Sequence, residues 1–241
     1  MITNQNEYTH CNELFYLRKK NNMLKAVIFD MDGVIIDSEP LHHKAYHKMF
    51  EDVNVNVSSE LYESLTGKST LNVCKQICDI FKLKESPETL VAIKRKHYEY
   101  IFNNDKDFDL IDGVLDLIKD YHANGLTLVL ASSASMPSIE RIFKRFHLNP
   151  YFKAKLSGAD LKASKPHPEI FINAAKASGF SKEECMVIED STNGIQAANS
   201  ANIFCVGFDS VHSKNQDYTT ANKVITSFKA IAFNKISGIL N

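Results

Sequence analysis

The sequence lacks the features that mark membrane and secreted proteins. No apolar stretch approaches the roughly 20 residues that span a bilayer, and the first residues contain no apolar signal-peptide core. The five cysteines are irregularly spaced, which is typical of free thiols in a reducing compartment and not of a disulfide framework. We therefore expect a cytoplasmic protein with no membrane partner.

An excess of charge of either sign is also missing. The 28 basic and 29 acidic residues give a formal net charge of -1, which argues against the basic surface that general nucleic-acid binding needs. Hydrophobic residues make up 44% of the 241 residues, as in an ordinary globular protein of one large or two modest domains. We expect no nucleic-acid partner, and a monomer or weak homo-oligomer.

The most informative pattern present is a pair of carboxylates, Asp30 and Asp32, after the apolar run 24–29. A run rich in Val, Ile and Phe predicts a buried parallel strand, and Gly33 allows a sharp turn after it. Both acids then lie at the carboxyl end of a strand, where open α/β sheets bind ligands. Because two like charges this close need a cation or a shared proton, the pair predicts a reactive, metal-binding site more than a plain surface turn.

Apolar patterns after residue 108 alternate between strand and helix. The expected strands are 126–131, 154–156, 185–188, 203–207 and 224–225, and the helices between them include 113–124, 139–146 and 192–200. This alternation predicts an α/β fold with a Rossmann-like, doubly wound parallel sheet. Between the first strand and residue 108 only amphipathic helical patterns recur, which indicates an inserted α-helical bundle.

The expected domains follow from these patterns. Residues 23–37 and 109–241 would form the α/β core, and residues 38–108 a helical cap domain over the sheet edge. Residues 1–22 are polar, so we expect a flexible N-terminal extension, with an extra helix or an upstream start codon as alternatives.

Polar residues follow three more of the expected strands. Ser132 and Ser133 end one strand, Lys165 lies in a later loop, and Glu189 and Asp190 end another strand. Carboxyl ends of parallel strands meet at one edge, so these side chains can converge with the acid pair. Each also has an ordinary alternative: a strand-terminal serine, a solvated loop lysine, and acids that cap the following helix.

Together these segments resemble the four motifs of the haloacid dehalogenase-like superfamily, over about residues 24–228. The matching segments are Asp30-Met31-Asp32-Gly33-Val34, the strand end at Ser132, Lys165-Pro166 and Glu189-Asp190-Ser191. Segments 37–40 and 164–168 are similar to the branch of β-phosphoglucomutases and small sugar-phosphate phosphatases. In that branch a helical cap is inserted between the first and second motifs.

The resemblance implies phosphoryl transfer that depends on Mg²⁺. Asp30 would be the nucleophile that forms an aspartyl-phosphate, and Asp32 the general acid and then the general base. Ser132 would donate a hydrogen bond to the phosphoryl oxygens, and Lys165 would stabilise charge on nucleophile and phosphate. The implied Mg²⁺ ligands are Asp30, the backbone carbonyl of Asp32, Asp190 and, directly or through water, Glu189.

Substrate choice in this branch depends on the cap, where the sequence is ambiguous. His42 matches a hinge histidine and Lys96 roughly matches a substrate-contacting lysine, but a half-buried histidine and a charged face over 94–96 are equally open. The loop 67–70 occupies the place of a phosphate-binding arginine in the mutases, and Thr70 stands there instead. The expected substrate-binding residues are His42, Gly67, Lys68, Lys96 and Ser133.

The missing arginine favours one of the enzymatic alternatives over the other. A mutase must bind a second phosphate, for which Lys68 could only partly substitute as a point charge. We therefore predict a Mg²⁺-dependent phosphatase acting on a small-molecule phosphate ester, with a sugar phosphate expected. The alternatives are a β-phosphoglucomutase-type mutase, a pyrophosphatase or an enzyme acting on a nucleotide-derived phosphate ester, and a non-catalytic binding protein of the same fold.

Overall fold

The computed structural model describes residues 23–65, 69–159, 161–211, 213, 215–236 and 238–240. The chain divides into two compact units, Met1–Ile36 with Leu110–Asn241 and Asp37–Asp109. The expected extension 1–22 and the expected substrate-binding residues Gly67 and Lys68 lie outside the described residues. None of the described helices combines the length and apolar character of a membrane span.

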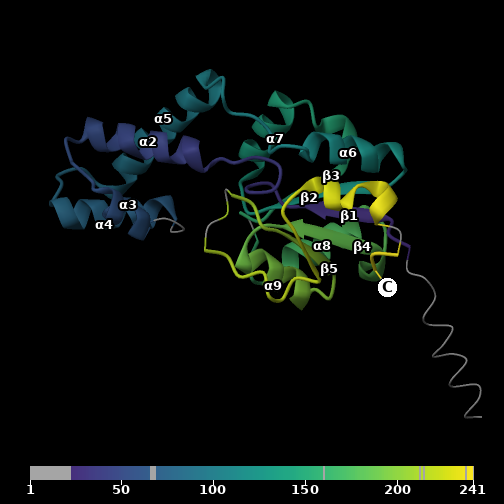
Figure 1. The fold of residues 1–241 in the computed structure, drawn as a ribbon. Coiled ribbons are helices and arrows are strands. Elements are labelled where there is room, and N and C mark those ends of the chain that lie inside the picture. The colour runs from purple at the N-terminus through teal and green to yellow at the C-terminus, as the bar shows by residue number, and fades with distance from the viewer. Residues whose placement is uncertain are drawn as a thin grey trace, which may run out of the picture. The chain divides into compact units, whose positions relative to one another are not determined.

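The first unit, here called the sheet unit, is built on six parallel strands in the order β3-β2-β1-β4-β5-β6 (Figure 1). Their bounds are β1 Ala26–Phe29, β2 Thr127–Ser132, β3 Phe152–Ser157, β4 Cys185–Glu189, β5 Phe204–Phe208 and β6 Lys223–Ile225. β1 pairs on both sides and all four of its residues are buried. A strand with both faces covered must be apolar throughout. The doubly wound parallel sheet expected from the sequence is confirmed.

Helices cover both faces of this sheet (Figure 1). α6 (Val114–Ala123) and α7 (Met136–Arg145) lie on one face, and α8 (Glu169–Ser178) and α9 (Thr192–Ser200) on the other. Successive residues of β1 alternate between them: Ile28 packs in the cluster that includes α8 and α9, whereas the Phe29 ring lies 6.4 Å from that of Tyr121 in α6. The hydrophobic core therefore holds the sheet fixed beneath the residues that follow its strands.

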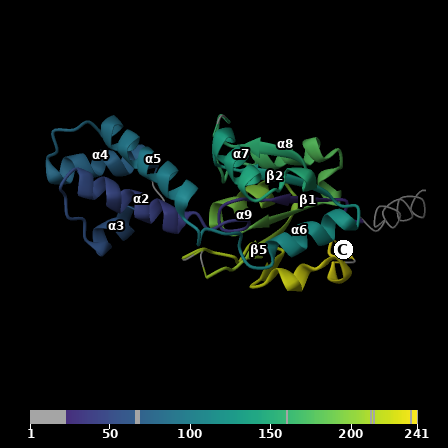
Figure 2. The same ribbon diagram turned by 90° about the horizontal axis from the view of Figure 1, so that it is seen from above.

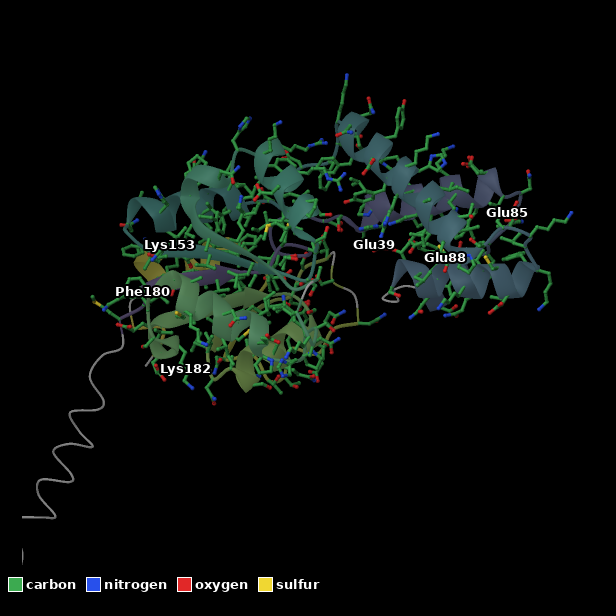
Figure 3. All side chains as sticks on the ribbon, turned by 180° about the vertical axis from the view of Figure 1, so that it is seen from behind. Glu39, Glu85, Glu88, Lys153, Phe180 and Lys182 are labelled. Atoms are coloured by element: carbon green, nitrogen blue, oxygen red, sulfur yellow. The ribbon has the colours of Figure 1, made fainter. Side chains whose placement is uncertain are left out.

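The amino ends of the strands form the edge of the sheet that Figure 3 labels with Lys153, Phe180 and Lys182. Lys153 lies near the start of β3 and its Nζ donates to the Ser178 carbonyl at 2.8 Å. Lys182 opens a short 3-10 helix directly before β4. The polar residues singled out in the sequence follow the opposite, carboxyl ends of the strands.

The second unit, here called the helical unit, consists of α2 (Glu39–Asp52), α3 (Ser59–Leu65), α4 (Thr70–Phe81) and α5 (Pro87–Asn104). α5 packs against both α2 and α4, as Figure 2 shows. Their shared core contains Tyr46, Met49, Phe50, Leu65, Ile77 and Leu90. Ser69 and Ser86 cap α4 and α5, because each hydroxyl accepts a backbone N–H from the first helical turn.

Candidate active site

Three carboxylates meet at the carboxyl edge of the sheet. Oxygens of Asp30, Glu189 and Asp190 all lie within 4.8 Å of one another. The pairing of β1 with β4 explains why: Phe29 is opposite Ile188, and the Asp30 N–H donates to the Ile188 carbonyl at 3.0 Å. The residues after these two strands are therefore neighbours, as their places in the sequence predicted.

Lys165 joins this cluster from the loop after β3. Its side chain is only 7% exposed, and its Nζ donates to Asp30 Oδ1, to Glu189 Oε1 at 2.8 Å and to the Ala131 carbonyl at 3.2 Å. Burial alone would lower the pKa of Lys165, but the charges of Asp30 and Glu189 and their hydrogen bonds outweigh burial and raise it. Lys165 is therefore a permanent cation between two carboxylates.

One lysine does not balance three acids. Burial raises the pKa of Asp30 well above its usual range, Lys165 opposes that shift, and Glu189 and Asp190 add to it. Burial, followed by the charge of Glu189, raises the pKa of Asp190 to about 7. Clustered carboxylate oxygens with excess negative charge are a suitable donor set for a hard cation such as Mg²⁺. The cluster can therefore bind a metal ion.

Two glycines make room for these acids. Gly33 has a φ of +83°, and a Cβ built on it would lie 1.9 Å from Asp190 Oδ2. A Cβ on Gly194, in the first turn of α9, would lie 1.7 Å from Glu189 Oε1. Any side chain at either position would collide with a cluster acid. The sequence pattern predicted the turn at Gly33 but not the role of Gly194, although a glycine inside a helix is a recognisable anomaly.

The Glu189 carboxylate is held by hydrogen bonds on both oxygens. Oε1 accepts from Lys165, and Oε2 accepts from the Ser191 N–H at 2.7 Å and the Ser191 hydroxyl at 2.9 Å. The Ser191 Oγ in turn accepts the Gly194 N–H at 3.0 Å, which caps α9. The start of α9 thus fixes Glu189 in place, which favours contact with a metal through water over direct ligation.

Ser132 and Asp32 occupy different surroundings. Ser132 is 1% exposed at the end of β2, where its Oγ accepts the Ala134 N–H at 3.0 Å. Ser133 is exposed in the same turn, and Asp32 is exposed two residues beyond Asp30. The carboxylate of Asp32 is not among the three clustered acids, so ligation through its backbone carbonyl stays a prediction.

Comparison with known proteins shows the family to which a chain with these residues belongs. A family model described as haloacid dehalogenase-like hydrolase matches residues 27–208, which include the acidic cluster, Ser132 and Lys165. The chain belongs to this family.

Within the haloacid dehalogenase-like hydrolases, similar proteins include both phosphatases and mutases. The chain is 29% identical to a phosphorylated carbohydrates phosphatase of Thermotoga maritima over 90% of this chain and 97% of that protein. It is 31% identical to a β-phosphoglucomutase of Bacillus subtilis over 76% of this chain and 83% of that protein. The crystal structure of a β-phosphoglucomutase from Clostridium difficile superimposes with a TM-score of 0.72 at 28% identity, covering 91% and 98% of the two chains.

The helical unit of this haloacid dehalogenase-like protein contains a buried lysine that the sequence analysis missed. Lys94 is 3% exposed, and its Nζ lies 2.6 Å from His42 Nδ1 and 4.8 Å from the centre of the Tyr46 ring. His42 stacks on Tyr98 with ring centres 4.6 Å apart. The expected charged face over 94–96 is therefore wrong for Lys94, whereas Lys96 is exposed.

The electrostatics of this pair follow from its burial. Burial, followed by the charge of Lys94, lowers the pKa of His42 to about 3, so the imidazole is neutral. Burial lowers the pKa of Lys94 to about 8, and Glu39 opposes that shift. The burial of Lys94 could have been predicted from its spacing. The buried residues of α5 are Leu90, Lys94 and Phe102, which lie four and eight residues apart, as on one face of a helix.

Proposed function

We propose that this protein is a Mg²⁺-dependent phosphatase that hydrolyses a small phosphorylated metabolite, a sugar phosphate, through an aspartyl-phosphate. The observation that carries this proposal is Lys165 held between Asp30 and Glu189 inside an acidic cluster. This arrangement provides a nucleophile, a fixed positive charge and a cation site within one hydrogen-bonded group. The phosphatase similar over 97% of its length is named for phosphorylated carbohydrates, which supports the substrate class.

The two aspartates of the turn divide the reaction. An Asp30 oxygen attacks phosphorus, the bond from phosphorus to the ester oxygen breaks, and Asp32 gives its proton to that oxygen. Water then attacks the same phosphorus, Asp32 accepts a proton from it, and phosphate leaves the Asp30 carboxylate. Asp30 is buried and Asp32 is exposed, and the charge of Lys165, with that of a bound cation, would keep Asp30 ionised for its attack.

The remaining residues of the sheet unit bind and orient the phosphoryl group. Ser132 donates to its oxygens from the end of β2 with Ser133 beside it, and Lys165 offsets its charge. Mg²⁺ would supply further neutralisation of carboxylate and phosphate charge. The residues that would hold it are Asp30, the Asp32 carbonyl, Asp190 and, through water, Glu189.

The helical unit contributes recognition of the rest of the substrate. Lys94 carries a buried charge, which an anionic or hydroxyl-rich ligand would stabilise. Neutral His42 fixes the position of the ammonium group. We assign to Lys94 the contact that the sequence suggested for Lys96, and retain Gly67 and Lys68 as further proposed contacts.

A panel of phosphate esters tests the proposal. Purified protein is incubated with hexose, pentose and hexitol monophosphates, a nucleoside monophosphate and β-glucose 1-phosphate, with Mg²⁺ or with EDTA. We expect free phosphate from a sugar monophosphate only with Mg²⁺, and a loss of at least about 10³-fold in turnover for Asp30→Asn. Asp116→Asn, an exposed aspartate on α6, is the matched control and keeps full activity.

The mutase is the second candidate, because the chain is 31% identical to a named β-phosphoglucomutase. It predicts glucose 6-phosphate from β-glucose 1-phosphate without free phosphate. Formation of glucose 6-phosphate without free phosphate would show that the protein is a mutase and not a phosphatase. The role assigned to Asp30 would be the same in both. Wild-type protein that is inactive on every ester, with no effect of Asp30→Asn, would reject both enzymatic readings.

A further inference from the structure

Residues 216–220, in the segment after β5, lie beside α9, which begins just after the cluster acids (Figure 1). Gln216 Oε1 accepts the Thr192 N–H at 2.8 Å and the Thr192 hydroxyl at 3.0 Å. The Asp217 N–H donates to Thr192 Oγ1 at 2.8 Å, and Asn199 donates to the Thr220 carbonyl at 2.9 Å. These contacts fasten the segment to both ends of α9.

Ser213 extends this attachment to the acidic cluster. Its hydroxyl donates to Oδ2 of Asp190. The same oxygen approaches the turn after β1, since it would lie 1.9 Å from a Cβ on Gly33. The Asp190 carboxylate is therefore confined between the turn after β1 and the segment after β5. A donor on one oxygen restricts the rotation of a carboxylate and leaves the second oxygen available to a cation.

We propose that Ser213 is a positioning residue that acts through Asp190: its hydroxyl holds the carboxylate ready for the metal ion. This inference rests on the metal site of the proposed function. Outer hydrogen bonds of this kind reduce the reorganisation that a ligand undergoes when a metal binds. The remaining cluster acids are held by other means, Glu189 by Ser191 and Asp30 by Lys165. Asp190 thus depends on a contact from the segment after β5, the strand that pairs with β4.

Metal affinity measured without turnover tests this role. Mg²⁺ is titrated calorimetrically into metal-free wild-type protein, Ser213→Ala and Ser213→Thr. We expect the dissociation constant of Ser213→Ala to rise by about 10- to 100-fold. Ser213→Thr keeps the hydroxyl and is expected to stay within about threefold of the wild type, since its donor can make the same bond.

A matched serine controls for the loss of any hydroxyl. The Ser227 side chain accepts the Lys229 N–H at the short 3-10 helix Phe228–Ile231, so Ser227→Ala should leave Mg²⁺ affinity unchanged. The melting temperature in EDTA should be the same for Ser213→Ala and the wild type. If Ser213 were merely structural, Ser213→Ala would have a lower melting temperature in EDTA, and Mg²⁺ would not restore the wild-type value.

Enzyme assays separate the positioning role from chemistry. With the phosphatase substrate, Ser213→Ala should need more Mg²⁺ for half-activation yet reach wild-type kcat at saturating Mg²⁺. Wild-type affinity in Ser213→Ala would overturn the positioning role and leave the proposed function standing. Wild-type protein that binds no Mg²⁺ would overturn both.

Discussion

Lys165 and Lys94 are both withdrawn from solvent, but their surroundings are opposite in charge. In the sheet unit, Lys165 donates to the carboxylates of Asp30 and Glu189, and these charges outweigh burial and raise its pKa. In the helical unit, Lys94 faces aromatic rings and the neutral His42, so burial dominates and lowers its pKa to about 8. A buried lysine is thus stabilised by carboxylates in the sheet unit, whereas in the helical unit it is destabilised by burial.

This difference indicates what each unit lacks. The sheet unit holds three clustered acids against one lysine, so it gains stability from a bound cation. The helical unit holds a cation that burial penalises and that Glu39 offsets only in part, so it gains from a bound anion or strong acceptor. Mg²⁺ carries the charge that the sheet unit lacks, and the hydroxyl oxygens of a sugar phosphate are acceptors for Lys94. The two lysines therefore provide two independent tests of the proposed substrate class.

Removing Lys165 should have the largest effect. Lys165→Met leaves Asp30 and Glu189 buried without their cation, and we expect a loss of about 3–5 kcal/mol in the free energy of unfolding. The loss should be greatest at high pH and should shrink toward acid, because the raised pKa of Asp30 lets that carboxyl take up a proton and lose its need for a counter-charge. Chemical denaturation across pH measures this. An unchanged midpoint at pH 8 would show that the lysine is not the counter-charge.

Removing Lys94 should have a smaller effect of the opposite sign. Its folded pKa of about 8 lies below the ordinary 10.5, so its charged form is penalised in the folded state at pH 7. We expect Lys94→Met to raise stability at pH 7 by about 1–2 kcal/mol. Wild-type Lys94 becomes neutral as the pH rises through 8. The difference in stability between Lys94→Met and the wild type should therefore narrow toward pH 10.

The matched control for this variant is Lys96→Met, two residues along the same helix and exposed. We expect Lys96→Met to change stability by no more than about 0.5 kcal/mol. For the sugar phosphate substrate, KM should rise about 10- to 100-fold in Lys94→Met, because a charged hydrogen bond is lost. A larger rise in KM for Lys96→Met would restore the assignment made from the sequence.

Several site residues of the sheet unit could be predicted because they lie at the carboxyl ends of strands. Asp30, Ser132 and Glu189 each come at the end of an apolar run, and parallel pairing brings the ends of such runs to one edge. Strand identity and order therefore determine which side chains meet. A local pattern was sufficient to place them without knowledge of any long-range contact.

Other residues depend on contacts between distant segments that no local pattern encodes. Lys94 is buried against His42, which is 52 residues away, although its neighbours in a run of three basic residues suggested a solvated face. Ser213 donates to Asp190 across 23 residues from a segment without a recognisable motif. These pairings arise from tertiary packing, which overrides the local preference of each residue.

The smallest expected effect concerns pH and the charge excess of the acidic cluster. The pKa of Asp190 is about 7 in the metal-free protein, above its ordinary 3.8. Below pH 7 the carboxyl is protonated, and a metal ion must displace that proton to bind. We expect the apparent Mg²⁺ dissociation constant to rise up to about tenfold for each pH unit below 7 and to level off above it.

The same shift predicts how stability depends on pH. The pKa of Asp190 is higher in the folded state than in the unfolded state. Its stabilising contribution to the folded state is therefore complete below about pH 4 and is lost as the pH rises through 7. Melting temperatures with EDTA should therefore fall over this range, and saturating Mg²⁺ should reduce the fall because it binds the charged form. If the melting temperature depended on pH in the same way with EDTA and with Mg²⁺, the acidic cluster would not be short of positive charge. The contrast between the surroundings of Lys165 and Lys94 would then fail.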